Sequence, residues 1–266
     1  MTPPRLVEPG MRVAPVAGKA RAAAAVTAAP TAAIRQDAAP APAGRTAPRV
    51  AIVIDDLGDS LDTAKRVLAL APAVTVAVIP FRSASAAVAA AAVAGGREVI
   101  LHLPLEPERR AEMNGGSGFL RTSMQPDAIE QQLERDLRAV PYIIGVNGHM
   151  GSRFTSDPQA MRTLLGALHE RGLFFLDSKT SPESVAAELA SRLEVPFAER
   201  DVFLDHDPEP AAVARALANA ARIARQTGQA IAIGHPHEST LTALAGWLPA
   251  MARQGIEVVP LSALVR

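Results

Sequence analysis

The sequence has no cysteine among its 266 residues, and its formal net charge is zero, with 27 basic and 27 acidic residues. The lack of cysteine excludes disulfide scaffolds, thiolate zinc sites and thiol nucleophiles, so any bound metal must be held by histidine, aspartate or glutamate. No block of like charge occurs along the chain, and we therefore expect no nucleic-acid or anionic-membrane partner.

Long hydrophobic runs are also missing. A membrane-spanning helix needs roughly 18 or more consecutive apolar residues, whereas the nearest candidate, residues 22–34, is short, mostly alanine and interrupted by Pro30. We therefore predict no transmembrane segment in this chain. Lys19 and Arg21 precede the alanine run, but the run lies far from Met1 and has no leucine-rich centre, so we identify no clear export signal.

Residues 1–48 are rich in alanine and proline and contain few large apolar residues. Such a segment cannot bury enough apolar surface to offset the entropy lost on ordering. We therefore predict a disordered tail or linker at 1–48 and one folded domain at 49–266. The composition changes at Arg49, after which the apolar, β-branched residues 50–54 predict a buried strand.

Strand-like and helix-like segments then alternate to the C-terminus. Further strands are predicted at 74–79, 98–102, 143–146, 173–176, 202–204, 230–233 and 256–259. Helices are predicted at 63–70, 84–93, 127–139, 158–171, 182–193, 210–226 and 241–253. The alternation predicts an α/β fold with a mainly parallel sheet, but periodicity alone does not decide between a barrel and an open, doubly wound sheet. The long connection 103–126, with its glycine-rich run 114–118, is predicted to be an active-site loop.

Polar or ionisable residues follow most of the predicted strands. They are Asp55-Asp56, His102, Asn147-Gly148-His149, Asp177 and His235. Because the carboxyl ends of parallel strands form the face that holds the active site in α/β folds, we expect these side chains to converge. The structural alternative is helix capping, for example by Asp56 or Asp59 at a helix that begins near Leu61.

The residue types indicate a metal site with a possible general acid or base near it. Neutral imidazoles such as His102 are good zinc ligands. Asp55 and Asp56 leave a buried strand in opposite directions, so one can bind a cation while the other stays near a bound water. Glu106 could be a further ligand, could orient one, or could be a solvated loop carboxylate. His235 is placed to act as a general acid or base.

Three further residues are candidates for contacts with the substrate or with the metal ligands. Ser152 and Arg153 offer hydrogen-bond donors to a substrate oxyanion. Asp177 could hold a histidine or a substrate hydroxyl. A turn that needs glycine around His149, and helix capping by Asp177, are the structural alternatives.

Taken in order, five motifs resemble the divergent polysaccharide deacetylases, a branch of the carbohydrate esterase superfamily. They are Ile54-Asp55-Asp56, His102-Leu103-Pro104-Leu105-Glu106, Gly148-His149-Met150-Gly151-Ser152, Leu176-Asp177-Ser178 and Gly234-His235-Pro236. The resemblance runs from about Val50 to the C-terminus. It implies a distorted (β/α) barrel of about seven parallel strands.

The resemblance further implies that Asp55 is the general base and that Asp56 binds a divalent metal, expected to be zinc, beside His102. The superfamily usually has two histidines four residues apart, whereas Glu106 takes the second position here. The third ligand is then His149 or Glu106, and we prefer His149 because a nitrogen ligand suits zinc and limits the buried negative charge. The implied reaction is hydrolysis of an acetamide or ester, with His235 protonating the leaving group.

The altered second motif also motivates an alternative, namely a barrel that keeps the metal but binds glycan or a partner protein without turnover. Aromatic residues are only 3% of the chain, which leaves little material for stacking on sugars. This argues against a long glycan and leaves a carbohydrate or another small acetylated substrate open. The resemblance implies a periplasmic or cell-envelope setting, in which the Ala/Pro-rich tail would serve as a spacer.

Overall fold

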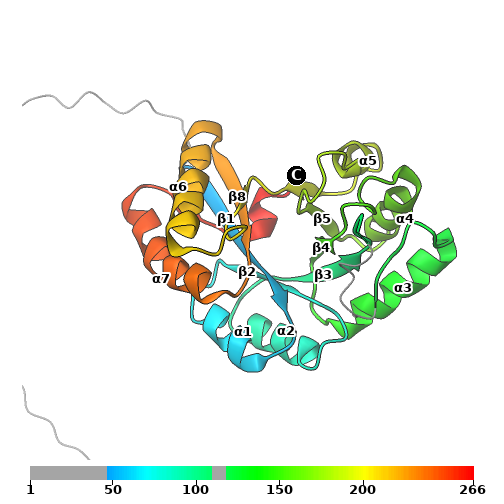
Figure 1. The fold of residues 1–266 in the computed structure, drawn as a ribbon, viewed down its shortest axis with the longest axis horizontal. Helices are drawn as coiled ribbons and strands as arrows, with labels where there is room; N and C mark the ends of the chain where they lie inside the picture. Colours follow the sequence, from blue (N-terminus) through cyan, green and yellow to red (C-terminus); the bar gives the residue numbers. More distant parts are fainter. Residues whose placement is uncertain (1–46, 110–117) are drawn as a thin grey trace, which may run out of the picture. The chain divides into compact units, whose positions relative to one another are not determined.

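The computed structural model describes residues 47–109 and 118–266, which form seven α-helices around a parallel sheet (Figure 1). The predicted tail up to residue 46, and the stretch 110–117 of the predicted active-site loop, lie outside the described residues.

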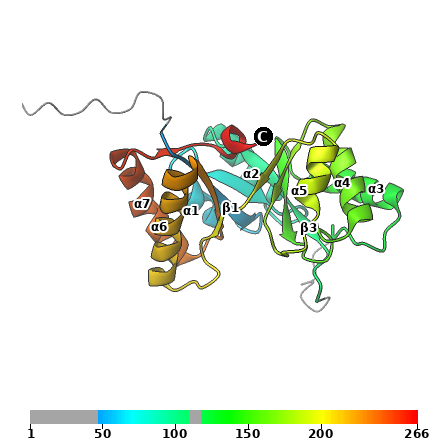
Figure 2. The ribbon, with the colours of Figure 1, turned by 90° about the horizontal axis from the view of Figure 1, so that it is seen from above.

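One sheet of nine strands runs through the described part of the chain, and all of its strand pairs are parallel. The strands are β1 (Arg49–Leu57), β2 (Thr75–Val78), β3 (Val99–Leu105), β4 (Gly145–Met150), β5 (Phe174–Asp177), β6 (Phe197–Glu199), β7 (Val202–Phe203), β8 (Gln229–Gly234) and β9 (Glu257–Val258). Their order is β6-β5-β4-β3-β2-β1-β8-β7, with β9 beside β1. Consecutive strands from β1 to β6 are therefore neighbours, and the helices lie on the outer side of the curved sheet (Figures 1 and 2).

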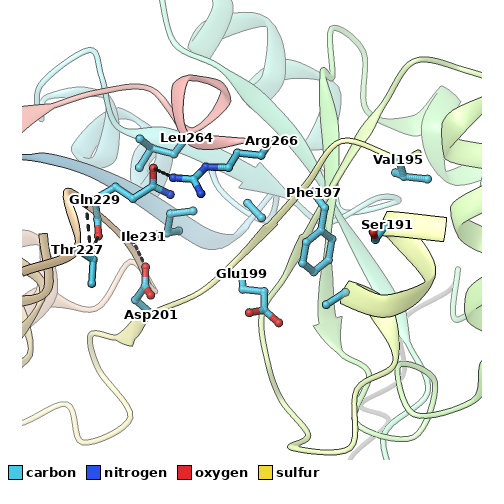
Figure 3. Close-up of a pocket in the computed structure, with 12 residues that line it drawn as sticks. Ser191, Val195, Phe197, Glu199, Asp201, Thr227, Gln229, Ile231, Leu264 and Arg266 are labelled. Atoms are coloured by element: carbon cyan, nitrogen blue, oxygen red, sulfur yellow. Dashed lines mark hydrogen bonds between the residues drawn. The ribbon is translucent and has the colours of Figure 1, made fainter. Parts of the chain in front are cut away.

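The barrel is not fully closed. β6 and β7 follow each other in the chain without pairing, and the backbone of Phe197 in β6 instead exchanges hydrogen bonds of 2.7 and 3.1 Å with Arg266. A cavity of about 560 Å³ opens beside this seam, and its lining includes Glu199, Asp201 and Gln229 (Figure 3). None of the site residues predicted from the sequence lines this cavity. The arrangement confirms the predicted distorted barrel, with more strands than the expected seven.

The described helices are α1 (Leu61–Leu68), α2 (Ser85–Ala94), α3 (Pro126–Ala139), α4 (Pro158–His169), α5 (Ala186–Arg192), α6 (Pro210–Thr227) and α7 (Glu238–Arg253). Four of them, α1, α3, α4 and α6, begin at a side-chain cap or at a proline. The side chains of Ser60 and Asp157 accept hydrogen bonds from the first backbone N–H groups of α1 and α4. Proline occupies the first turn of α3, α4 and α6, where its missing N–H costs no intrahelical bond. Capping of α1 by Asp56 or Asp59, the structural alternative considered above, is therefore wrong.

Two apolar layers cover the two faces of the sheet. In β1, Ile52 packs between the sheet and the helices, whereas Ala51 and Val53 point into the barrel interior. The interior layer also contains Leu261 and Leu264 from the C-terminal 3₁₀-helix (Leu261–Leu264). The Leu261 N–H donates to the hydroxyl of Thr75, the first residue of β2, so this helix lies at the amino ends of the strands. The carboxyl ends at the opposite side are left for polar side chains.

Three strands extend at least three residues beyond their predicted ends. β1 continues through Leu57, β3 through Leu105 and β4 through Met150. The candidate site residues of these strands therefore lie within them and not directly after them. β6 was not predicted, because its three residues are too few to show a hydrophobic period.

Asp136 on α3 is a fully buried carboxyl group. Among the described residues, its Oδ1 accepts a hydrogen bond of 2.7 Å from Gln132, and its Oδ2 has no partner. Burial raises the pKa of Asp136 to about 7, because the hydrogen bond from Gln132 and the charge of Arg135 offset only part of the desolvation. The folded chain therefore holds a proton on Asp136 that the unfolded chain releases at lower pH.

We predict that Asp136→Asn stabilises the fold at pH 8 and changes its stability little near pH 4. The pKa in the folded chain lies above the ordinary value of 3.8, so stability falls as pH rises from the ordinary value through the raised one. The substitution should remove a penalty of roughly 2–4 kcal/mol at pH 8. Urea unfolding of both proteins at the two pH values measures this difference. Asp127→Asn, at an exposed position of the same helix, is the control, and an equal effect of Asp136→Asn at both pH values would contradict the prediction.

Candidate metal centre

Three side chains from different strands meet at the carboxyl end of the sheet. Asp56 comes from β1, His102 from β3 and His149 from β4. Asp56 Oδ1 lies 3.1 Å from His102 Nε2 and 3.0 Å from His149 Nδ1, and these two imidazole nitrogens are 3.1 Å apart. One carboxylate oxygen and two nitrogens thus form a nearly equilateral triangle. We call these three side chains the metal triangle, after the ion that they could hold.

The triangle has the dimensions of a metal site. A tetrahedral zinc ion at its usual ligand distances of about 2.0–2.1 Å would separate the ligand atoms by about 3.3 Å, which is close to the observed spacing. Two imidazoles and a carboxylate are a common ligand set for catalytic zinc, and three protein ligands leave a fourth position for water or substrate. The residues present, Asp56, His102 and His149, therefore fit a divalent metal such as zinc.

The backbone of β1 is irregular where it presents the two carboxylates. The register with β2 shifts between Ile54 and Leu57, and Asp56 has a φ of +57°, a left-handed conformation that is uncommon for residues other than glycine. Asp55 is buried, whereas the Asp56 side chain is 37% exposed. Both nevertheless approach His102, whose Nε2 is 3.7 Å from Asp55 Oδ2. The irregularity allows two adjacent residues to serve one site.

Asn147 in β4 joins the metal triangle to Asp55. Its Oδ1 lies 2.9 Å from His102 Nδ1, and its Nδ2 donates a hydrogen bond of 2.9 Å to Asp55 Oδ1. Asn147 is fully buried. In the sequence, this residue stands out only as part of the run before His149, and no role was predicted for it.

Burial and the neighbouring charges have opposite effects on the pKa values of these groups. Burial would raise the pKa of Asp56, but contacts with His102 and His149 outweigh it and hold that pKa far below its usual range. Burial would lower the pKa of His102, but Asp55, Asp56 and Asn147 raise it to about 9. Burial dominates at Asp55 and raises its pKa. In the metal-free protein, a proton on His102 therefore supplies the positive charge that a metal ion would supply.

His235 follows β8 and is held by Asp205, a residue that was not predicted to belong to the site. The Nδ1 atom of His235 lies 2.9 Å from Asp205 Oδ1, and its backbone N–H donates to Asp205 Oδ2 at 2.6 Å. The Thr240 hydroxyl also donates to Asp205 Oδ2, at 2.7 Å. His235 Nε2 faces the metal triangle, 3.8 Å from Asp56 Oδ2. Burial would lower the pKa of His235, but Asp205 and the other carboxylates raise it.

Asp205 could have been found from the sequence. It comes immediately after the predicted strand 202–204, and the rule that selected Asp55 and His102 applies there as well. Its oxygens, together with His235 and His237, form a second group of metal-ligand type among the described residues. Because both oxygens of Asp205 already bind His235, we assign this group to the orientation of His235.

The predicted residues Glu106, Ser152 and Arg153 lie outside the triangle and connect two loops. Glu106 is fully buried, and its Oε2 accepts hydrogen bonds from the backbone and hydroxyl of Thr122. Ser152 Oγ accepts a hydrogen bond from the backbone N–H of Glu108. The half-exposed Arg153 lies 3.7 Å from Glu106 Oε1. These contacts tie the loop after β3 to the loop after β4.

Asp177 ends β5 and organises its own loop. Its Oδ1 accepts from the backbone N–H of Lys179, and its Oδ2 accepts from the Ser184 hydroxyl. The helix-capping alternative considered for Asp177 is therefore wrong, because α5 begins after Val185 without a side-chain cap. Asp177 nevertheless lies at the same edge of the sheet as the metal triangle.

Residues 52–265 match the model of a family described as divergent polysaccharide deacetylase. An uncharacterized protein of Haemophilus influenzae is 37% identical over 196 residues, which cover 74% of this chain and 69% of that protein.

Solved structures show the same fold. The uncharacterized protein ATU2773 from Agrobacterium tumefaciens C58 has a TM-score of 0.80 at 30% identity, and the match covers 85% of this chain and 92% of that chain. The peptidoglycan deacetylase PdaC from Bacillus subtilis has a TM-score of 0.52 at 15% identity, with 83% and 91% covered, which is a likeness of fold alone. Since the family model spans most of its length, this chain belongs to the divergent polysaccharide deacetylase family.

Proposed function

We propose that the protein is a metal-dependent hydrolase that removes acetyl groups from N- or O-acetylated sugars or from a cell-envelope glycan. The observation that carries this proposal is an acid and a base on either side of the metal triangle. Asp55 Oδ2 is 3.7 Å from His102 Nε2, and His235 Nε2 is 3.8 Å from Asp56 Oδ2. A metal-bound water with a general base and a general acid beside it is a set of groups suited to hydrolysis of an amide or ester.

Each residue has a role in the proposed reaction. Asp56, His102 and His149 would hold the metal, which when bound supplies a water of lowered pKa and polarises the substrate carbonyl. Asp55 accepts a proton as water adds to the acyl carbon. His235 donates a proton to the leaving nitrogen or oxygen as its bond to the acyl carbon breaks, so acetate and an amine or alcohol are released.

The Asp205 carboxylate orients His235 and favours its protonated form for this step. Because Asp205 accepts at Nδ1, the donating nitrogen of His235 is Nε2, which faces the site. The raised pKa of His235 favours the protonated form that a general acid requires.

The family supports an acetylated sugar as the substrate, and by the same argument we propose a periplasmic or cell-envelope location. Arg153, whose side chain is 52% exposed at the end of β4, is the candidate for a hydrogen bond to substrate. Ser152 is the second candidate, since its hydroxyl accepts from the Glu108 N–H and, among the described residues, donates to no acceptor. Among the described residues, no helix is long and apolar enough to cross a bilayer.

A non-catalytic barrel that binds glycan or a partner protein is the second candidate function. It is favoured by Glu106, which replaces the second histidine of the superfamily motif and contacts Thr122 instead of the metal triangle. The ligand set is then completed from a different strand by His149. Metal binding without acetate release from any acetylated sugar would favour this candidate.

We predict that the purified protein binds one zinc ion and that His149→Ala weakens binding by roughly 100-fold or more, because an imidazole ligand is lost. Glu106→Gln is the matched control and should keep the affinity within a few-fold, because Glu106 holds loops together. Competition with a colorimetric chelator measures both affinities. Loss of zinc in Glu106→Gln, with His149→Ala unchanged, would identify Glu106 as the third ligand.

The affinity for zinc should rise with pH. His102 has a raised pKa of about 9 in the metal-free site, and zinc binds only the neutral imidazole, so each ion must displace about one proton at neutral pH. The affinity should increase about tenfold per unit between about pH 6 and 8. Calorimetric titrations in buffers of different ionisation enthalpy count the released protons. A pH-independent affinity with no proton release would show that His102 is already neutral.

His235→Ala should lower kcat for acetate release from a small acetylated sugar by roughly 10²–10⁴-fold, because the leaving group loses its proton donor. Zinc content should stay at the wild-type level. Asp205→Asn should cause a smaller loss, and His206→Ala, at an exposed position, should behave as wild type. Wild-type turnover in His235→Ala would remove that residue from the mechanism.

A further inference from the structure

We propose that Asn147 is a positioning residue that sets the tautomer of the metal ligand His102 and the orientation of the base Asp55 at the same time. The inference rests on the proposed function and adds a residue to it. Asn147 contacts both groups with the two ends of one amide, at 2.9 Å in each case.

The strand register explains how one side chain reaches both. His102 and Asn147 are direct partners across the β3–β4 pair, so their side chains lie on the same face of the sheet. Asn147 and His149 are two residues apart in β4 and also share that face. Asp55 comes from β1, three strands away in the sheet. The Asn147 amide therefore spans the curved interior of the barrel.

The orientation of the amide follows from its partners. An ionised Asp55 can only accept hydrogen bonds, so the NH₂ end of Asn147 must face it, and the carbonyl end must face His102. His102 then donates from Nδ1, which leaves the lone pair of Nε2 for the metal. Nε2 is the atom that lies 3.1 Å from both Asp56 Oδ1 and His149 Nδ1.

Few other residues could replace this amide. Asn147 is fully buried, so there is no room for bulk water to take over its hydrogen bonds. A carboxylate at this position would still accept from His102 but could not donate to Asp55. Among the described residues, the Asn147 side chain has one further hydrogen-bond partner, the Ser178 hydroxyl, 3.5 Å from Nδ2, and that hydroxyl donates its own proton to the carbonyl of Gly148 at 3.2 Å.

Two variants separate the two contacts. Asn147→Ala removes both and should weaken zinc binding by roughly 10- to 100-fold, the usual effect of losing the partner of a metal-bound histidine. Asn147→Asp keeps an acceptor for His102 and should hold zinc within a few-fold of wild type, while kcat for acetate release falls at least tenfold at unchanged KM. Asn219→Ala on α6 is the matched control, because its amide oxygen accepts only from Arg222 of the same helix, and it should change neither zinc affinity nor kcat.

Nitrogen-15 NMR of the imidazoles gives a readout that needs no turnover. The zinc-loaded wild type should show His102 with its proton on Nδ1, and Asn147→Ala should lose the downfield signal of that hydrogen-bonded proton.

A folded Asn147→Ala protein that binds zinc as tightly as wild type would overturn the proposal. If Asn147→Ala does not fold, the near-isosteric Asn147→Asp decides, and wild-type kcat in that variant would overturn it. If the wild type binds zinc but releases no acetate, the proposed function fails, while the affinity and NMR outcomes still test the link from Asn147 to His102.

Discussion

Two imidazoles and a carboxylate from three different strands lie within 3.1 Å of one another, and the backbone of these strands must hold them together. This constraint explains several otherwise unrelated features. Asp56 adopts a left-handed backbone at a register shift in β1, and the loops after β3 and β4 are tied together through Glu106. Without bound metal, the proton held by His102 reduces the repulsion between the neighbouring carboxylates. A metal ion would replace that proton and retain the geometry.

The apolar interior of the barrel confines the polar side chains to the carboxyl ends of the strands. Side chains of alternating strand positions fill the interior as far as the C-terminal 3₁₀-helix, which lies at the amino ends of the strands. The polar residues are thereby concentrated at the carboxyl ends, where water is partly excluded and each buried group needs a partner. Asn147 supplies a partner to two of them, and Asp205 supplies one to His235. In such an environment, the loss of one hydrogen bond changes the geometry of a whole network.

Much of this arrangement could be predicted from the sequence, because parallel strands bring their carboxyl ends together whatever their order. That rule was enough to select Asp55, Asp56 and His235 from the sequence alone. Other features depend on information that no hydrophobic pattern contains. The end of β3 at Leu105 is set by its pairing with Met150, the last residue of β4. The role of Asn147 depends on side-chain directions across the interior of the curved sheet. The seam between β6 and β7 is set by strands too short to be recognised from periodicity.

We infer that Asp56, His102 and His149 form a three-ligand metal site. Anomalous X-ray diffraction at the zinc absorption edge, on crystals grown with zinc, would locate the ion. We expect one strong peak about 2.0–2.2 Å from an Asp56 oxygen, His102 Nε2 and His149 Nδ1. No peak at this position under zinc-replete conditions, or a peak coordinated by Glu106 in place of His149, would contradict it.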